Sequence, residues 1–550
     1  MLRKCAPSPA RRRAAFVGVL AVAALLAPPG AARAFEPQRT FPDTRNGIYV
    51  FVDQLGSLST AQRQFAAAHY VGTQKQTSGL IDAIRAYDPN FIMLQYRLGV
   101  RESGYPGGPV FIHDNTWCND WGSINPNEDW FIHDDDGNRV YQLYGGSVYE
   151  YCMDISGAVN GNTTNGWKEY WSACVIDDCD DSHADGVFAD STHLPYAVPA
   201  DLWDSPIGGP PHTPYIPHME TFYDYTYQQF DQAGKYFIPN IGGLCTTVDT
   251  TAGYYEDVHG AMVEGFATKL SNYDWKLQQN RTLRLLGNDK IYIAQSGVSG
   301  HTDIEGRRWL MSNFLLLKHD RSFINICGAG SQMHWWPEYD LDLGAPDDPD
   351  VPGDVDDLQV AGGLYARGYA HGVALVNPAS GQRTWSLPDD GNAWFLVTPY
   401  GGGRVLSDGQ IERDSGLTFT RQADDVAVDG WSGTILVKTA LGDAQLDWTV
   451  DVLDLAILAN HFGEVEATWF DGDFNGDGVV DVLDLAVVAN NFGAGGGAGG
   501  GTVPEPGALL LLAVGAAGAA RRRRRPAGSL CDVRARRPSA ARGPAGSAPR

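Results

Sequence analysis

Eight short apolar runs, separated by helix-like stretches, constrain the fold of this 550-residue chain more than any other feature. The runs lie at 47–52, 91–96, 149–153, 186–189, 236–239, 260–264, 290–295 and 322–327. The helix-like stretches lie at 60–69, 78–87, 219–233, 267–279 and 305–318. Strands that alternate with helices predict a parallel sheet, and eight such units predict a closed (β/α)8 TIM barrel over residues 35–355. A doubly wound sheet is the alternative, which the count of eight and the lack of a phosphate-binding glycine motif disfavour.

The pattern changes after the eighth run. Residues 356–440 contain short strand-like runs such as VALVNP, AWFLVTP and TILVK, which Gly, Asp and Pro turns separate. Short strands with frequent turns are typical of antiparallel sheets. We therefore predict an α/β fold class in which a small β-sandwich-like domain follows the barrel.

A duplicated segment follows this region. Residues 443–463 read DAQLDWTVDVLDLAILANHFG, and residues 473–493 read DFNGDGVVDVLDLAVVANNFG. Calcium loops need oxygen ligands at loop positions 1, 3, 5, 9 and 12 and a backbone carbonyl at position 7. The predicted ligands are Asp443, Gln445, Asp447, Thr449, Asp451 and Asp454 in the first loop, and Asp473, Asn475, Asp477, Val479, Asp481 and Asp484 in the second.

Each loop leads directly into an apolar helix, and the pair resembles a type I dockerin over residues 441–494. The first loop departs from the dockerin pattern at Gln445 and at Trp448, where glycine is usual. The resemblance implies a small α-helical module with Ca²⁺ as its cofactor and a cohesin-like protein as its partner. No cofactor is expected for catalysis.

Both ends of the chain read as export and sorting signals. Residues 1–34 combine three arginines, an apolar run and an Ala-Arg-Ala site, which predicts a signal peptide. A Gly/Ala linker at 495–502 precedes VPEP, an apolar stretch and five arginines at 503–525. This segment resembles the PEP-CTERM sorting signal, which implies a processing enzyme as partner and transient membrane anchoring. Residues 526–550 are expected to be disordered, and the mature protein is expected outside the cell or on its surface.

Charge narrows the range of partners. The formal net charge is −25 although both ends are basic, so the central part of the chain is strongly acidic. Such a surface repels nucleic acid and is compatible with neutral polysaccharide or with Ca²⁺. We therefore expect no nucleic-acid partner, and the charge is compatible with a polysaccharide or oligosaccharide substrate.

Polar residues at the ends of the barrel runs are the candidates for chemistry, because the active sites of these barrels lie at the carboxyl ends of the strands. Asp190 and Glu264 each end a short apolar strand, and glycoside hydrolysis requires two carboxyl groups with different pKa values. We predict Asp190 as the nucleophile or base and Glu264 as the proton donor. The predicted substrate-binding residues are Asp53, Arg97, Asp154, Asn240 and Gln295. A strand-end Asp can instead cap a helix or anchor a loop.

Other residues leave alternatives open. His193 and His301 could line the cleft. Trp117, Trp121, Trp335 and Trp336 are either sugar platforms or core residues. Six cysteines outside the two ends permit up to three disulfides, and Cys174 and Cys179 could close a small loop.

The barrel region resembles the hypothetical glycoside-hydrolase-like family 15. The resemblance is carried by the motifs DPNFIMLQYR (88–97), NEDWFIHDDDGNRV (127–140), CMDIS (152–156), ADGVFAD (184–190), MVEGF (262–266) and HGVALVNP (371–378). It implies a nucleophilic Asp after strand four and an acid Glu after strand six, which match Asp190 and Glu264. The resulting hypothesis is an extracellular glycoside hydrolase that acts on a polysaccharide. The alternative is a non-catalytic surface protein that uses the barrel to bind glycan and the dockerin-like module for attachment.

Overall fold

The fold is described from a computed structural model of the chain, over residues 35–104, 121–134, 136–144, 148–156, 166–192, 215–242, 256–268, 271–328 and 333–495. The signal-peptide and sorting-signal predictions fall outside these residues, as do those for Trp117, Cys118, His193 and Cys245. Among the helices in the described ranges, none is long and apolar enough to cross a membrane.

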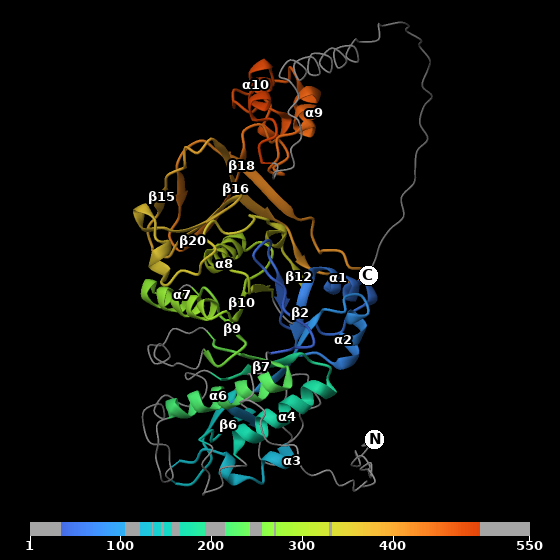
Figure 1. Cartoon of the computed structure of the whole chain (residues 1–550), viewed down its shortest axis with the longest axis vertical. Helices are drawn as coiled ribbons and strands as arrows, with labels where there is room; N and C mark the ends of the chain where they lie inside the picture. Colours follow the sequence, from blue (N-terminus) through green and yellow to red (C-terminus); the bar gives the residue numbers. More distant parts are fainter. Residues whose placement is uncertain are drawn as a thin grey trace, which may run out of the picture.

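A parallel eight-stranded sheet forms the centre of the molecule (Figure 1). Its strands are β1 (Val50–Val52), β2 (Tyr70–Gln74), β3 (Ile92–Leu98), β7 (Gly186–Asp190), β8 (Tyr236–Pro239), β9 (Gly260–Glu264), β10 (Ile291–Gly297) and β11 (Ser322–Cys327). Each strand pairs with its neighbour in chain order, and β1 pairs with β11. A parallel bridge between Asn240 and Met262 joins the end of β8 to β9 and closes the barrel. The predicted TIM barrel is therefore confirmed.

Six helices cover the outside of the described barrel. They are α1 (Thr60–His69), α2 (Ser78–Arg85), α4 (Trp167–Asp181), α6 (Tyr215–Ala233), α7 (Asn272–Gly287) and α8 (Ile304–Leu317). Several begin at a side-chain cap that satisfies their first backbone N–H groups. Ser59 and Gln62 form a capping box at α1, and Asp303 accepts from the amide of Gly306 at α8.

One expected barrel strand was assigned wrongly. The run at 149–153 belongs to β6 (Val148–Cys152), which pairs antiparallel with β4 (Arg101–Gly104) and β5 (Tyr141–Tyr144). This small sheet and the short helix α3 (Trp121–Ile124) are an insertion between β3 and α4. The missed barrel strand is β2, whose sequence YVGTQ has few apolar residues although Thr73 and Gln74 are fully buried.

Alternate strand residues fill the barrel interior. Phe51, Leu94, Phe188, Met262 and Ile293 belong to one buried cluster, which is separate from the cluster between the strands and the surrounding helices. Side chains alternate between the two faces of a strand. A residue an even number of positions away on the same strand therefore also points into the barrel. This parity brings Asp53, Asp190, Asn240, Glu264 and Gln295 to the same end of the interior.

The segment at 35–45 closes the opposite end of the barrel. Phe41 packs its ring against Phe51, Tyr236 and Phe323, with ring centroids 5.1–5.8 Å apart. Thr44 donates to the carbonyl of His319 at 2.7 Å and accepts from the amide of Ser322 at 2.9 Å. The first described residues therefore form a plug beneath the strand starts.

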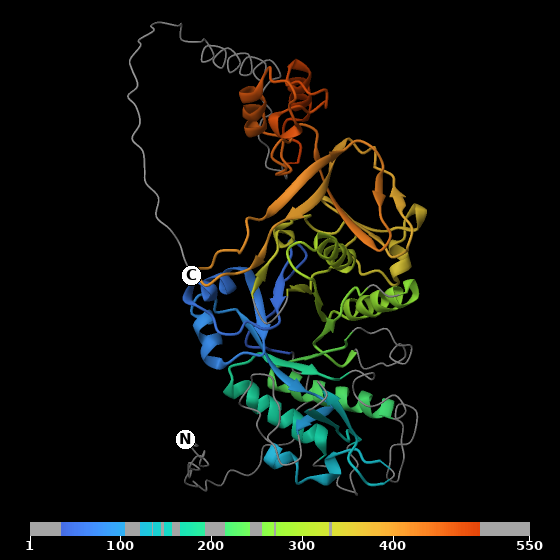
Figure 2. The same ribbon diagram turned by 180° about the vertical axis from the view of Figure 1, so that it is seen from behind.

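Antiparallel sheets follow the barrel (Figure 2). A five-stranded sheet contains β13 (Tyr365–Tyr369), β14 (Gly372–Asn377), β20 (Ser432–Ala440), β16 (Asn392–Tyr400) and β18 (Gly416–Gln422), in this order. Two strand pairs flank it: β15 (Arg383–Trp385) with β19 (Val426–Val428), and β12 (His334–Trp335) with β17 (Gly403–Arg404). One face of the large sheet packs on α8, and a small apolar cluster that includes Trp394 and Leu436 fills the other.

The duplicated segment forms two loop–helix units beyond this sheet. Their helices are α9 (Val452–His461) and α10 (Val482–Asn491). They lie at the end of the molecule farthest from α3 in both views (Figures 1 and 2). The expected order of barrel, antiparallel β region and small helical module is therefore confirmed.

Two smaller expectations were not met. Cys174 and Cys179 do not close a loop, because they lie five residues apart on α4, too far around the helix to meet. Their thiols instead donate to Asp178 and to the carbonyl of Gly186. Trp121, Trp335 and Trp336 are buried core residues, which leaves their faces unavailable as sugar platforms.

Candidate active site

Asp190 and Glu264 meet at the carboxyl end of the barrel. The amide nitrogen Nδ2 of Asn240 donates to Asp190 Oδ1 at 2.8 Å and to Glu264 Oε2 at 2.9 Å. Because both oxygens bond the same nitrogen, they lie less than about 6 Å apart. The strands β7 and β9 hold the two carboxyl groups, and the residue after β8 bridges them.

The two carboxyl groups have different surroundings. Asp190 accepts hydrogen bonds from the Tyr96 hydroxyl at 2.8 Å and from the Ser191 amide at 2.7 Å, besides that of Asn240. These three donors fix the orientation of the Asp190 carboxyl group. Glu264 accepts a second hydrogen bond from Gln295 Nε2 at 3.0 Å. Burial, and then the charge of Asp190, raise the pKa of Glu264 to about 7.

Asp190, Asn240 and Glu264 belong to a ring of polar side chains at the carboxyl ends of the barrel strands, here called the strand-end ring. The ring continues on the neighbouring strands. Gln295 accepts a hydrogen bond from Asn325 Nδ2 at 3.0 Å, so its amide is held with its nitrogen toward Glu264. Asp53 accepts a hydrogen bond from Gln74 and forms an ion pair with Lys75 at 3.0 Å. The described ring therefore contains three carboxylates and one ammonium group among neutral amides.

Two of the predicted substrate-binding residues do not join this ring. Tyr96 and Leu98 point into the barrel, so Arg97 points outward, where it is 2% exposed and forms an ion pair with Glu102. Asp154 follows β6 of the inserted sheet instead of a barrel strand, and it caps the turn at Ser156. Asp154 was misplaced because a run in the insertion was taken as a barrel strand, whereas Arg97 lies on a true barrel strand and is excluded by the direction of its side chain.

Four ring residues were missed by the sequence analysis: Gln74, Lys75, Tyr96 and Asn325. Gln74 and Lys75 went unnoticed because β2 itself was not recognised. Tyr96 and Asn325 lie inside apolar runs, where only the strand parity identifies them as interior. The signal that identifies Lys75 is its position directly after β2, at the carboxyl end of a barrel strand. His301 lies just before α8.

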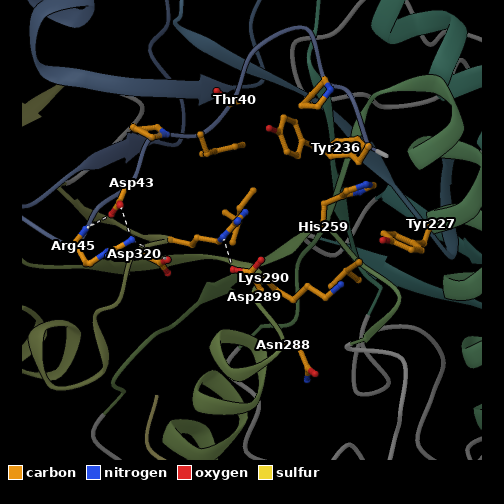
Figure 3. Close-up of a pocket in the computed structure, with 17 residues that line it drawn as sticks. Thr40, Asp43, Arg45, Tyr227, Tyr236, His259, Asn288, Asp289, Lys290 and Asp320 are labelled. Atoms are coloured by element: carbon orange, nitrogen blue, oxygen red, sulfur yellow. Dashed lines mark hydrogen bonds and ion pairs between the residues drawn. The ribbon is translucent and has the colours of Figure 1, made fainter. Parts of the chain in front are cut away.

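A separate cavity of about 630 Å³ lies at the other end of the barrel (Figure 3). Residues at the strand starts, among them Tyr236, His259 and Ile291, line it together with the segment at 35–45. None of the strand-end carboxylates contributes to this lining. The cavity is therefore distinct from the candidate active site.

The two loops of the duplicated segment share one arrangement of backbone donors. Asp473 accepts from the amides of Gly476, Asp477 and Gly478, and Asp443 accepts from those of Gln445 and Trp448. In both loops, the carboxylate at loop position 12 also accepts a hydrogen bond from the backbone amide of the second loop residue. Asp484 accepts from the amide of Phe474, and Asp454 accepts from that of Ala444.

The donor chemistry of the loops fits calcium. Asp443, Asp454, Asp473 and Asp484 are at most 4% exposed, and burial raises the pKa of Asp454 to about 6. Buried carboxylates of this kind need a cation, and Ca²⁺ prefers oxygen ligands alone. Within the described residues, no three His, Cys, Asp or Glu side chains lie together closely enough to hold an ion. When bound, Ca²⁺ would neutralise these carboxylates.

Comparison with known families identifies the barrel. The model of hypothetical glycosyl hydrolase family 15 matches residues 85–373, which is more than half of the chain. The chain belongs to this family. The model of the type I dockerin domain matches residues 441–493, and that of the PEP-CTERM protein-sorting motif matches residues 502–525. All three resemblances predicted from the sequence are confirmed, and the last two indicate an exported protein of the cell surface or the extracellular space.

No curated protein matches this family 15 chain. Several solved glycoside hydrolases resemble its fold at low similarity. A GH27 β-L-arabinopyranosidase from Geobacillus stearothermophilus has 10% identity and a TM-score of 0.37, over 71% of this chain and 97% of its own. Pullulanase from Bacillus acidopullulyticus has 11% identity and a TM-score of 0.34, over 74% and 62%. A family 5 glycoside hydrolase from Bacteroides vulgatus has 11% identity and a TM-score of 0.30, over 74% and 95%.

Proposed function

We propose that this family 15 chain is an exported glycoside hydrolase in which Asp190 is the nucleophile and Glu264 is the proton donor. The observation that carries the proposal is the Asn240 amide, which hydrogen-bonds both carboxyl groups and so keeps them close together. The surroundings of the two groups also differ in the sense that the reaction requires. Asp190 accepts three hydrogen bonds, and the pKa of Glu264 is raised to about 7, as suits a proton donor.

The short separation favours retention of the anomeric configuration. Retaining glycosidases hold their carboxyl groups about 5–5.5 Å apart, whereas inverting ones leave about 6.5–9.5 Å for a water molecule. In the first step, an Asp190 oxygen bonds to the anomeric carbon while the glycosidic C–O bond breaks and Glu264 donates its proton to the leaving oxygen. In the second step, Glu264 takes a proton from water, the water oxygen bonds to the anomeric carbon, and the bond to Asp190 breaks.

Charge around the site favours a neutral sugar. The described ring contains Asp53, Asp190 and Glu264 but only Lys75 as a cation. A uronic acid or a sulfated sugar would add a further negative charge next to Asp190, at a cost in binding. We therefore propose an uncharged polysaccharide or oligosaccharide as the substrate class. The dockerin-like module, with a cohesin-like partner, and the processed sorting segment would attach the enzyme at the cell surface.

Hydrolysis of a panel of 4-nitrophenyl glycosides and soluble polysaccharides tests the proposal. Asp190→Asn and Glu264→Gln should each lower kcat/KM by about 10²–10⁴-fold with the fold intact. Azide should restore turnover of Glu264→Gln on activated aryl glycosides. Asp320→Asn, at the opposite end of the barrel, is the matched control and should keep full activity.

Two results would overturn the assignment. Full activity in Asp190→Asn or Glu264→Gln would exclude the residue from the reaction. Binding of glycans without any turnover of the panel by the wild-type protein would favour the non-catalytic glycan-binding alternative. A product of inverted configuration, observed by NMR at early times, would contradict the retaining mechanism alone.

A further inference from the structure

Lys75 has an unusual position in the strand-end ring. It follows β2 directly, and its backbone is left-handed, with φ = 61°. Residues other than glycine rarely adopt this conformation, which persists where the surroundings impose it. Its side chain is only 13% exposed. A long charged side chain is thus held inside the barrel mouth by a strained backbone.

The ammonium group of Lys75 is fixed from several directions. Its Nζ lies 3.0 Å from Asp53 Oδ1. It also lies 4.9 Å from the ring centroid of Tyr96 and 5.5 Å from that of Phe188. The hydroxyl of the same Tyr96 donates to Asp190, so Lys75 and the proposed nucleophile share a neighbour.

The charged and titratable groups that face Lys75 come from five strands: Asp53 after β1, Tyr96 of β3, Asp190 of β7, Glu264 of β9 and Cys327 of β11. Burial lowers the pKa of Lys75, but the charges of Asp53, Glu264 and Asp190 outweigh it and raise that pKa above its ordinary value. The group therefore stays charged. In return, Lys75 lowers the pKa of Glu264 against the stronger effects of burial and of Asp190.

We propose that Lys75 is a positioning residue whose ammonium, held by Asp53 above Tyr96, sets how tightly Glu264 holds its proton beside Asp190. Its catalytic consequence rests on the proposed function, whereas its effect on the proton of Glu264 does not. Without this cation, Asp53, Asp190 and Glu264 would be three neighbouring carboxyl groups with no neutralising partner among the described residues of the ring. Glu264 would then hold its proton more tightly and release it to the leaving oxygen less readily.

Direct titration of Glu264 tests the proposal without a substrate. The protein is labelled with ¹³C-carboxyl glutamate, and the Glu264 signal is assigned by its loss in Glu264→Gln. Lys75→Met should move the midpoint of Glu264 upward by about one pH unit, because removal of a nearby opposite charge disfavours the ionised form. Lys75→Arg should stay close to wild type.

Lys290→Met is the matched control for loss of a half-buried lysine. Lys290 Nζ lies 5.3 Å from the ring centroid of Tyr227, in the cavity at the opposite end of the barrel (Figure 3). This variant should leave the Glu264 titration unchanged. An unchanged midpoint in Lys75→Met would overturn the proposal, as would an equal shift in Lys290→Met. Lys75→Gln supplies a second neutral variant and is measured alongside, so that the result does not depend on one variant folding.

Activity supplies a second readout once a substrate is known. Lys75→Met should lower kcat by about tenfold or more, with little change in KM, and should move the alkaline limb of the pH profile, which Glu264 sets, toward higher pH. Lys75→Arg should restore most of the rate. If the wild-type protein hydrolyses nothing, the proposed function fails while the titration still decides the role of Lys75. A fall in activity without a shift of the pH profile would mean that Lys75 has only a structural role, and it would contradict the proposal.

Discussion

Asn240 determines the geometry of the candidate site. Its single amide nitrogen contacts Asp190 and Glu264, and its oxygen accepts from the amide of Gly242 at 2.8 Å, which fixes the orientation of the side chain. A neutral amide can hold two carboxyl groups together without neutralising either one. Burial and the charge of Asp190 raise the pKa of Glu264 and outweigh the lowering effect of the Asn240 hydrogen bond.

The raised pKa of Glu264 predicts a pH-dependent cost to stability. Its folded pKa of about 7 exceeds the ordinary value of 4.5, so the folded state binds the proton more tightly. Stability is then lost as the pH rises from about 4.5 to about 7, by about 3 kcal/mol in total. Glu264→Gln should remove this loss and unfold at higher denaturant concentration than wild type at pH 8, with a much smaller difference at pH 5.

Urea unfolding at the two pH values measures this effect. Glu256→Gln, a substitution of an exposed acid, is the control and should follow the wild type at both. A difference between Glu264→Gln and wild type that is the same at pH 5 and pH 8 would rule out a raised pKa in the folded protein.

At the level of elements, sequence periodicity located most of the barrel but missed β2. Seven of the eight expected runs are barrel strands, because their apolar side chains are buried on both faces of a parallel sheet. β2 buries Thr73 and Gln74 instead of apolar residues, and Gly72 packs directly against Ile92 and Phe51. The run in β6 has the composition of a buried strand, and only the pairing with β4 and β5 identifies it as part of an insertion.

The plug at 35–45 should contribute strongly to barrel stability. Phe41→Ala removes a ring that contacts Phe51, Tyr236 and Phe323, so we expect a loss of about 2–4 kcal/mol in unfolding free energy. Tyr87→Ala, a substitution of a ring that is 48% exposed, is the control and should cost much less. Thermal and urea unfolding measure both. Equal effects of the two substitutions would show that the plug is not part of the cooperative core.

At the scale of the whole molecule, the dockerin module is packed against the antiparallel sheet. Trp469 packs against Phe395 of β16 at 5.3 Å, and the guanidinium of Arg421 of β18 lies 4.7 Å from its ring centroid. Trp448, at the loop position where glycine is usual, lies 4.2 Å from the His371 ring. The departure from the dockerin pattern at Trp448 thus has a structural explanation: this side chain docks the first loop on the sheet.

This packing predicts how the protein responds to calcium removal. Chelation with EGTA should lower the unfolding temperature of the dockerin module and the sheet beneath it, because an ion that binds only the folded module stabilises it and its removal ends that stabilisation. Asp484→Asn should have a similar effect in the presence of calcium, whereas the exposed Asp408→Asn should not. Differential scanning calorimetry separates these transitions from that of the barrel. An unchanged calorimetric profile in EGTA would contradict a structural role for calcium.

The sequence alone determined the features that depend on local pattern. Strand and helix periodicity predicted the barrel, the duplicated loops predicted the dockerin module, and the strand ends pointed to Asp190 and Glu264, because each signal lies within a few consecutive residues. Only the tertiary structure decided which strand-end residues meet. Arg97 and Asp154 lie outside the candidate site, and Lys75 lies within it. Local sequence could not predict this, because strand pairing and the direction of each side chain depend on contacts between residues far apart in the chain. The Asn240 bridge and the docking of Trp448 on His371 depend on such contacts in the same way.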